Sequence, residues 1–357
     1  MENKNVRKYF PVKTVEDLFA LNNVIDEDNR LIYFEDIKID VPWGQIVGRW
    51  YGNRKVRPIL AIHGWMDNLG TWDRLIPLLP KHVGILCIDL PGHGRSSKLP
   101  LGITYHVFEY IFTIVRIVKE YKWRKVSLMG HSMGAIICFH YAALNPYMVD
   151  MLIQIDLIKD VYDSESRQIK QISERTEKLL IENERLEQLH IKTPPCYSYE
   201  QLEEALYRGS HRSVEKQYCK HLLNRSIAKA EQHPEKFYFS RDPRIKHHVR
   251  LSGEQKLSVE LAKRIRNIPY MLVRSHEQSL MTAKDEEIVD ILRANNPHFH
   301  YVRVKNTTHH LHLNSPEEVA AHLDPFILQH RPVILDSWSI DGNDNFSVNK
   351  PNISSKL

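Results

Sequence analysis

Short apolar runs alternate with segments of helical periodicity over the first half of the chain. The runs are rich in β-branched residues, whereas the segments place apolar residues three and four positions apart. The runs predict strands at residues 31–39, 45–51, 58–62, 84–88, 125–129 and 151–155. The segments predict helices at 70–79, 107–121 and 135–144. The first two runs suit an antiparallel pair, and the alternation that follows predicts a mainly parallel sheet with helices on both faces.

This alternation stops after residue 156 and resumes at residue 269. Charged helical patterns fill the interval and predict helices at 164–188, 199–208 and 214–230. Strands at 269–273 and 299–304 and helices at 285–293 and 316–329 then complete the pattern. The predicted organisation is an N-terminal extension (1–30), a first core part (31–156), a helical cap insertion (157–268), a second core part (269–336) and a polar tail (337–357).

The strand predicted at 125–129 leads directly into Gly130-His131-Ser132-Met133-Gly134. Glycines on both sides of a serine, between a strand and a helix, are typical of a nucleophile elbow. At either position a side chain would clash in the sharp turn. The turn exposes Ser132 Oγ beside a helix N-terminus, whose amides favour developing negative charge. We therefore expect Ser132 to be a catalytic nucleophile, supported by Gly130 and Gly134.

A serine nucleophile needs a base, and the loop after the last predicted strand is rich in histidine. His309 is the expected base, with His310 and His312 as alternatives in the same loop. The order of nucleophile and then histidine along the chain suits an α/β-hydrolase. A metal site is a weaker interpretation, because no carboxylate or cysteine has ligand spacing with these histidines. The expected reaction requires neither a metal nor an organic cofactor.

An oxyanion hole is expected from two backbone amides. One belongs to Met133, directly after the nucleophile, and the other to Trp65 in the loop that follows the strand at 58–62. His63 and Gly64 support this loop, since the glycine lets the backbone turn its amides toward the pocket. A plain turn is the alternative interpretation. The later Asp-Leu-Pro-Gly-His-Gly-Arg-Ser segment (89–96) is interpreted as a structural turn that supports the site.

The elbow, the His-Gly loop and the D-x-P-G-H-G-x-S turn together resemble the α/β-hydrolase fold family, over residues 58–155 and 269–328. Within it, Phe-Tyr-Phe-Ser-Arg-Asp-Pro-Arg (237–244) and the intact elbow resemble the serine hydrolase-like proteins, including the kraken-like insect members. The resemblance implies an eight-stranded type of sheet and a helical cap over the active site. Ser132 argues against the branches that attack through an aspartate. We expect a Ser-His-acid triad that hydrolyses a carboxylic ester or thioester through an acyl-enzyme.

The acid of this triad departs from the family pattern. The family usually offers an aspartate in the turn after the strand at 269–273, where this chain has Gln278, with Glu277 one position earlier. Glu277 is the preferred acid if the loop is shifted by one residue. Asp156, at the end of the strand at 151–155, is the alternative acid, and a capping or turn role for Asp156 is equally compatible with the sequence.

The amino-acid composition is typical of a globular protein. Hydrophobic residues make up 42% and charged residues 26% of the 357 residues. The formal charge of +5 is spread among many acidic residues, so we expect no nucleic-acid partner. The widely spaced cysteines suit reduced thiols, and no stretch resembles a signal peptide or membrane span. The cysteines are Cys87, Cys138, Cys196 and Cys219.

The chain ends in Ser355-Lys356-Leu357, a tripeptide that peroxisomal import receptors recognise. A peroxisomal enzyme is therefore expected, with the cytoplasm as the second choice.

Two functions remain open from the sequence. One is the ester or thioester hydrolase. The other is a weak or inactive hydrolase-fold protein that binds a lipid-like small molecule. A carboxylate within hydrogen-bonding reach of His309 Nδ1 favours the first. Cap aromatics are candidates for an acyl pocket or for cap packing; they are Tyr197, Tyr199, Tyr207, Phe237, Tyr238 and Phe239.

Overall fold

A computed structural model describes most of the two predicted core parts and the cap. The described residues are 34–52, 54, 56–161, 164–188, 194–247, 254–276 and 282–332. Glu277 lies outside these ranges, and so does the C-terminal tail with its Ser-Lys-Leu end. The acid role of Glu277 and the peroxisomal address therefore stay predictions.

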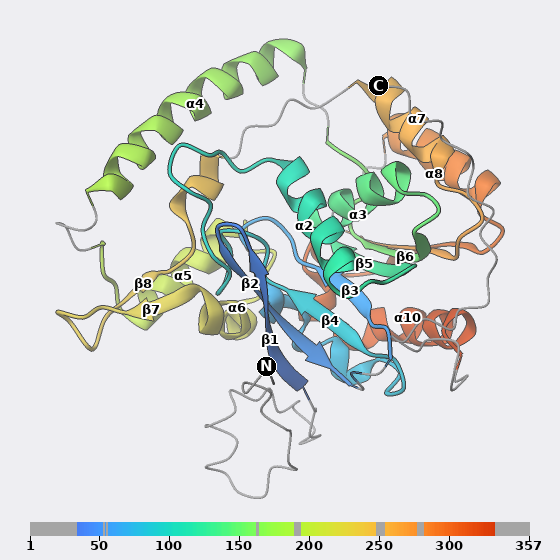
Figure 1. Ribbon diagram of the computed structural model, residues 1–357, viewed down its shortest axis with the longest axis horizontal. Helices are drawn as coiled ribbons and strands as arrows, with labels where there is room; N and C mark the ends of the chain where they lie inside the picture. Colours follow the sequence, from blue (N-terminus) through green and yellow to red (C-terminus); the bar gives the residue numbers. More distant parts are fainter. Residues whose placement is uncertain are drawn as a thin grey trace, which may run out of the picture.

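Eight strands form one sheet at the centre of the molecule (Figure 1). They are β1 (Phe34–Val41), β2 (Gly44–Tyr51), β3 (Ile59–Ile62), β4 (Ile85–Ile88), β5 (Val126–His131), β6 (Val149–Ile155), β9 (Tyr270–Ser275) and β10 (Phe299–Val304). Their order across the sheet is β1-β2-β4-β3-β5-β6-β9-β10. β2 is antiparallel to both β1 and β4, and the remaining neighbours are parallel. The predicted mainly parallel sheet with an antiparallel opening pair is confirmed.

Helices cover both faces of this sheet. They are α2 (Val107–Glu120), α3 (Met133–Leu144), α7 (Gln255–Arg264), α8 (Ala283–Asn295), α9 (Leu311–Asn314) and α10 (Pro316–His330). Alternate residues of β3 point to opposite faces, as the strand period of two requires. Leu60 and Ile62 pack in a core cluster with residues of α2, α3, α7 and α8. Ile59 and Ala61 pack in a second cluster with residues of α10.

The helix predicted at 70–79 is wrong. The structure has two short 3₁₀ turns there, η1 (Leu69–Trp72) and η2 (Ile76–Leu78). Pro77 lacks an amide hydrogen and so interrupts an α-helical ladder. Gly70 also lies so close to a cap helix that a Cβ there would be 2.2 Å from the carbonyl oxygen of His221. Tertiary contact and proline thus override the local helical spacing.

The residues between β6 and α7 are called the cap after the insertion predicted from the sequence. Its elements are α4 (Glu165–Glu187), α5 (Tyr199–Gly209), η3 (Lys216–Tyr218), α6 (Cys219–Ser226), β7 (Ile227–Lys229), β8 (Phe237–Phe239) and η4 (Pro243–His247). The long helix α4 runs along the outer rim of the molecule (Figure 1), and Leu179 is its buried residue. The helix expected to continue to residue 230 ends at Ser226, because β7 pairs with β8. α7 packs against α3 and α8, so the cap ends before α7 rather than at 268.

Two buried arginines attach the cap to the core. Arg225 on α6 donates to the Asp89 carboxylate through Nη2 at 2.8 Å, and Asp89 also accepts from the amides of Leu69 and Arg95. Burial raises the pKa of Asp89, but Arg225 and these donors outweigh it and lower that pKa below its usual value. Arg244 pairs with Asp242 and donates to the carbonyl oxygen of Pro100 at 2.9 Å. The turn at 89–96 and the segment at 237–244 thus connect the cap to the core.

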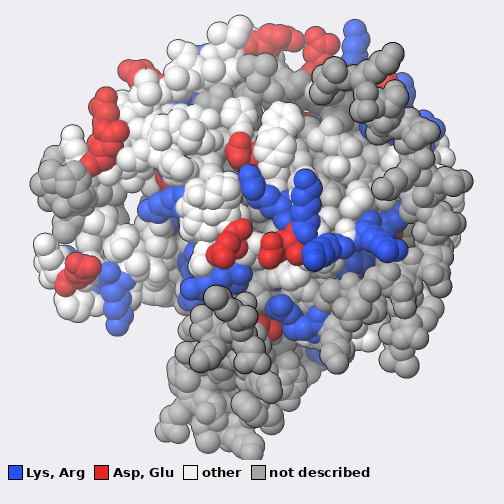
Figure 2. Space-filling model, in the orientation of Figure 1, with Lys and Arg blue, Asp and Glu red and all other residues white. Residues whose placement is uncertain are grey.

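Acidic and basic side chains are interspersed over the face shown in Figure 2. This pattern differs from the single-sign stripe that marks a nucleic-acid interface. The four cysteines are free thiols. Among the helices of the described ranges, none combines the length and apolar character needed to cross a bilayer.

Candidate active site

Ser132 lies at the sharp turn between β5 and α3. Its backbone has φ 53° and ψ −119°, a strained conformation for a residue with a side chain. Such strain costs about 1–3 kcal/mol and persists where the surroundings enforce it. Here the Ser132 amide donates to the carbonyl oxygen of Ile155 at 3.0 Å, and its carbonyl accepts from Ala135 at 2.9 Å. The side chain is partly exposed, as the elbow motif predicts.

The two glycines of the elbow are required by close backbone approaches. A Cβ at Gly134 would lie 2.1 Å from the carbonyl oxygen of Ile62 at the end of β3. A Cβ at Gly130 would lie 2.4 Å from the carbonyl oxygen of Gly134 itself. Because both obstacles are backbone atoms, they cannot move aside as a flexible side chain does. The turn is therefore compatible with glycine only.

Gly134→Ala is expected to destabilise the protein by about 3 kcal/mol, because β3 and α3 must separate to admit the methyl group. Urea unfolding followed by circular dichroism measures this loss. The matched control is Gly209→Ala at the end of α5, where a Cβ would meet no atom within 4 Å. That variant should gain up to about 1 kcal/mol from helix propensity. Equal stabilities for the two variants would contradict the close approach.

Ser132, His309 and Asp156 form a continuous hydrogen-bonded path. His309 Nε2 lies 2.8 Å from Ser132 Oγ, and His309 Nδ1 lies 2.6 Å from Asp156 Oδ2. Asp156 is fully buried, and its other oxygen accepts the amide of Ser275 at 2.7 Å. This geometry lets Nε2 take a proton from the serine while the carboxylate orients the ring.

The strand order explains why Asp156 reaches His309. Asp156 follows β6 directly, and its amide donates to the carbonyl oxygen of Val273 in β9 at 2.8 Å. β6 and β9 are parallel neighbours, so their carboxyl ends meet at the same place on the sheet edge. An acid after either strand can therefore serve the same histidine. The carboxylate that the structure places there is Asp156, the alternative acid of the sequence, at a backbone φ of 65°.

The loop after β3 lies against the nucleophile. A Cβ at Gly64 would be 3.2 Å from the Cβ of Ser132, so the loop touches the elbow. Trp65, the next residue, is anchored on the cap because its Nε1 donates to the carbonyl oxygen of Ile245 at 2.8 Å. Met133 opens α3, where helix amides have no partner within the helix. The two residues expected to form the oxyanion hole thus lie on the two segments that meet at Ser132.

His63 and His93 support this loop. His63 Nε2 accepts the amide of Leu90 at 3.0 Å, and His93 Nε2 accepts the amide of Met66 at 3.3 Å. Burial lowers the pKa of His63 and lowers the pKa of His93 to about 3, with the neighbouring His63 adding to the effect on His93. Both rings are therefore neutral hydrogen-bond acceptors at neutral pH.

These buried histidines predict a loss of stability in mild acid. The unfolded chain binds a proton at each ring near pH 6.5, whereas folded His93 does so only near pH 3. The unfolded state then binds more protons, so the free energy of unfolding falls as the pH drops below 6.5. When the pH falls from 6.5 to 5, His93 alone should lower the free energy of unfolding by about 1.5 kcal/mol.

Urea unfolding of EDTA-treated protein at the two pH values tests this dependence. His93→Asn should reduce the fall in the free energy of unfolding by about 1.5 kcal/mol, whereas His233→Gln, at an exposed position, should leave it unchanged. A free energy of unfolding that is the same at both pH values would contradict neutral burial of His93.

The alternative bases lie elsewhere. His310 Nε2 lies 3.3 Å from both carboxylate oxygens of Asp67, and His312 Nε2 lies 2.8 Å from Thr71 Oγ1. Asp67 is a buried carboxylate that sequence spacing did not indicate, because it is 243 residues from His310 along the chain. Its position follows only from the tertiary structure, in which the loops after β3 and β10 meet.

Most of the cap aromatics pack within the cap itself. Tyr199, Tyr207, Phe237 and Phe239 lie against a cluster that includes Leu222. These contacts support the cap-packing interpretation for these four.

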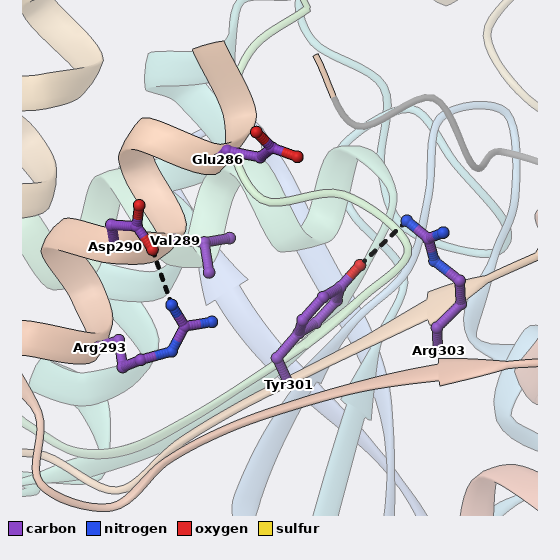
Figure 3. Close-up of a pocket in the computed structure, with 6 residues that line it drawn as sticks. All are labelled: Glu286, Val289, Asp290, Arg293, Tyr301 and Arg303. Carbon is purple, nitrogen blue, oxygen red and sulfur yellow. Dashed lines mark hydrogen bonds and ion pairs between the residues drawn. The ribbon is translucent and has the colours of Figure 1, made fainter. Parts of the chain in front are cut away.

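A separate hollow of about 550 Å³ lies between α8 and β10 (Figure 3). Its lining is mainly charged. Arg293 donates a hydrogen bond to Asp290, and Arg303 donates one to Tyr301. It contains none of the residues that surround Ser132. This hollow is therefore distinct from the candidate active site.

Comparison with known proteins agrees with this fold. The model of the α/β-hydrolase fold family matches residues 57–177. A probable serine hydrolase of Drosophila melanogaster is 37% identical over 303 residues, which cover 82% of this chain and 88% of that protein. A serine hydrolase-like protein of Danio rerio is 30% identical over 311 residues, covering 85% and 91%.

Solved structures share the fold. A hypothetical protein from Pseudomonas aeruginosa matches with a TM-score of 0.68 at 23% identity, covering 83% of this chain and 98% of that one. A thioesterase domain from the curacin biosynthetic pathway matches with a TM-score of 0.62 at 21% identity, covering 82% and 99%. The chain therefore belongs to the α/β-hydrolase fold family. Its similarity to the Drosophila and Danio proteins places it among the serine hydrolase-like members.

Proposed function

We propose that this protein hydrolyses a carboxylic ester or thioester through a covalent acyl-enzyme on Ser132. The observation that carries the proposal is the path from Asp156 through His309 to Ser132, with distances of 2.6 and 2.8 Å. A carboxylate within reach of His309 Nδ1 favours catalysis over the alternative of a non-catalytic lipid-binding protein. The names of the serine hydrolase relatives support the same reaction class.

Acylation begins when Ser132 Oγ attacks the carbonyl carbon of the substrate. His309 Nε2 accepts the hydroxyl proton, and the Asp156 carboxylate stabilises the imidazolium that forms. The amides of Trp65 and Met133 donate to the negatively charged carbonyl oxygen. His309 then passes its proton to the departing alcohol or thiol as the acyl–oxygen or acyl–sulfur bond breaks.

Deacylation repeats these steps with water. His309 takes a proton from a water molecule, whose oxygen attacks the acyl carbon of the Ser132 ester. Collapse of the tetrahedral intermediate returns the proton to Ser132 Oγ and releases the carboxylic acid. The residues named here supply the nucleophile, base and oxyanion donors, so the cycle needs no further chemical group.

A thioester substrate suits the proposed chemistry, because the serine attacks a carbonyl carbon in either substrate class. An ester is supported by the same triad chemistry. Matched ester and thioester pairs with the same acyl group, offered at the same concentration, separate the two substrate classes.

Fluorophosphonate labelling of the purified full-length chain tests the proposed function. The expected result is one covalent adduct per molecule, assigned to the Ser132 peptide by mass spectrometry. A panel of acyl esters and acyl-CoA thioesters of increasing chain length then identifies the substrate. A well-folded protein that takes no label and hydrolyses none of the panel would overturn the proposal and favour a binding role.

A further inference from the structure

Three buried donor groups converge beside the proposed triad, and the proposed reaction uses none of them. They are the Asp67 carboxylate and one imidazole nitrogen from each of His131 and His310, and their donor atoms all lie within 4.8 Å of one another. The exposed fractions of Asp67, His131 and His310 are 6%, 0% and 6%. Burial of a carboxylate among imidazoles is costly unless a cation or proton is shared between them.

A hydrogen bond outside the cluster identifies the nitrogen of His131 that carries no proton. His131 Nε2 lies 2.9 Å from the carbonyl oxygen of His309, and a carbonyl oxygen only accepts. Nε2 therefore donates, which leaves Nδ1 of the neutral ring with a lone pair. Within the described part of the chain this buried Nδ1 has no hydrogen-bond partner, and Asp67 Oδ2 lies 3.5 Å away.

The same reasoning applies to His310. Ser213 Oγ donates its single proton to the carbonyl oxygen of Ser210 at 2.6 Å, so it must accept from His310 Nδ1 at 2.8 Å. His310 Nε2 is then the bare nitrogen, 3.3 Å from each oxygen of Asp67. Both rings thus turn lone pairs toward a carboxylate, and their other nitrogens are held by outer hydrogen bonds. Metal-binding histidines are oriented in this way.

The spacing of the donors suits a small transition-metal ion. Zinc binds imidazole nitrogen and carboxylate oxygen at about 2.0–2.2 Å, so neighbouring donors of a tetrahedral site lie about 3.3–3.5 Å apart. The carboxylate lies 3.3 Å from one ring nitrogen and 3.5 Å from the other. The two imidazole nitrogens lie no more than 4.8 Å apart and have to move closer to reach this spacing.

Residue 64 has no side chain to crowd these donors. A Cβ at Gly64 would lie 3.0 Å from Asp67 Oδ2 and 3.1 Å from His131 Nδ1. The same point is 3.2 Å from the Cβ of Ser132, so the open space borders the nucleophile.

We propose that Asp67, His131 and His310 form a binding site for one divalent transition-metal ion of the zinc class. Two of these ligands directly precede or follow triad residues in the sequence, and the ring centroid of His131 lies 4.8 Å from that of His309. A divalent cation there disfavours the imidazolium that His309 forms during acylation. The ion is therefore inhibitory. This inhibition rests on the proposed function, whereas the binding of the ion does not depend on it.

Calorimetric titration of EDTA-treated full-length protein with Zn²⁺ tests the site, and the visible spectrum with Co²⁺ reports its geometry. We expect one ion per chain in the wild type. Asp67→Asn and His310→Gln should each weaken Zn²⁺ binding at least about 30-fold, since even outer-shell changes cost about 10–100-fold. His233→Gln, at an exposed position, controls for adventitious histidine binding and should match the wild type.

The alternative to a metal is a second proton on one of the two rings. In that case Zn²⁺ binds no more tightly to the wild type than to His310→Gln, and the proposal is overturned. Circular dichroism confirms that the variants are folded, and if Asp67→Asn does not fold then His310→Gln decides alone. Fluorophosphonate labelling with and without Zn²⁺ separates the two proposals: stoichiometric binding without any labelling leaves the metal site intact and overturns only the hydrolase.

Discussion

Ser132→Ala is expected to abolish fluorophosphonate labelling and to lower kcat for any hydrolysed ester or thioester by about 10⁶-fold, the order found when a serine nucleophile is removed from a triad. The reason is that Oγ is the atom that forms the acyl-enzyme. His309→Ala should lower kcat by a similar factor, because no other base is bonded to Ser132 Oγ in the described part of the chain. The two losses should not add, since serine and histidine act as one unit.

Steady-state kinetics with the best substrate of the panel measures these losses. Ser164→Ala at the start of α4 and His322→Gln on α10 are matched controls, because both side chains are exposed. Both controls should keep kcat within about twofold, since surface changes rarely disturb a distant site. A Ser132→Ala protein that keeps its label would assign the nucleophile to another residue.

Asp156→Asn is expected to lower kcat about 10⁴-fold with little change in stability. Asparagine keeps an oxygen that can accept the Ser275 amide, so the hydrogen bond to the end of β9 is preserved. It loses the negative charge that stabilises the His309 imidazolium and selects the correct tautomer. The effect therefore falls on kcat, while KM for the substrate remains close to the wild-type value.

Glu277→Gln is the matched comparison, because Glu277 is the other acid that the sequence offers. If Asp156 serves His309 in solution, this variant keeps nearly full activity. The reverse result, with activity lost in Glu277→Gln and kept in Asp156→Asn, would assign the acid to the loop after β9. Measuring kcat for both variants and their double mutant decides between the two carboxylates.

Local patterns predicted most of the sheet and the covering helices. Period-two and period-3.6 patterns depend on neighbouring residues, so the strands at β3, β4 and β5 and the helices α2, α3 and α10 were found near their observed bounds. The helix prediction at 70–79 was wrong because Pro77 and the contact of Gly70 with the cap outweigh the helical spacing of the apolar residues. The end of α6 was misplaced because β7 pairs with a strand that lies further along the chain.

The nucleophile could be proposed from the chain alone because its geometry is local. Five consecutive residues create the elbow, and steric exclusion of side chains at Gly130 and Gly134 is readable from their identity. His309 could also be predicted, since the order of elements places a histidine-rich loop after the last strand. The acid that pairs with this histidine could not be predicted in the same way.

Which carboxylate meets His309 depends on the order of strands across the sheet, not on the order along the chain. β6 and β9 are neighbours although 114 residues separate Asp156 from Tyr270, so either strand end could supply the acid. Asp67 is likewise brought to His131 and His310 from distant loops that end at one sheet edge. Local sterics and periodicity made the elements and the elbow predictable, whereas long-range strand pairing and burial selected the acid and assembled the histidine cluster.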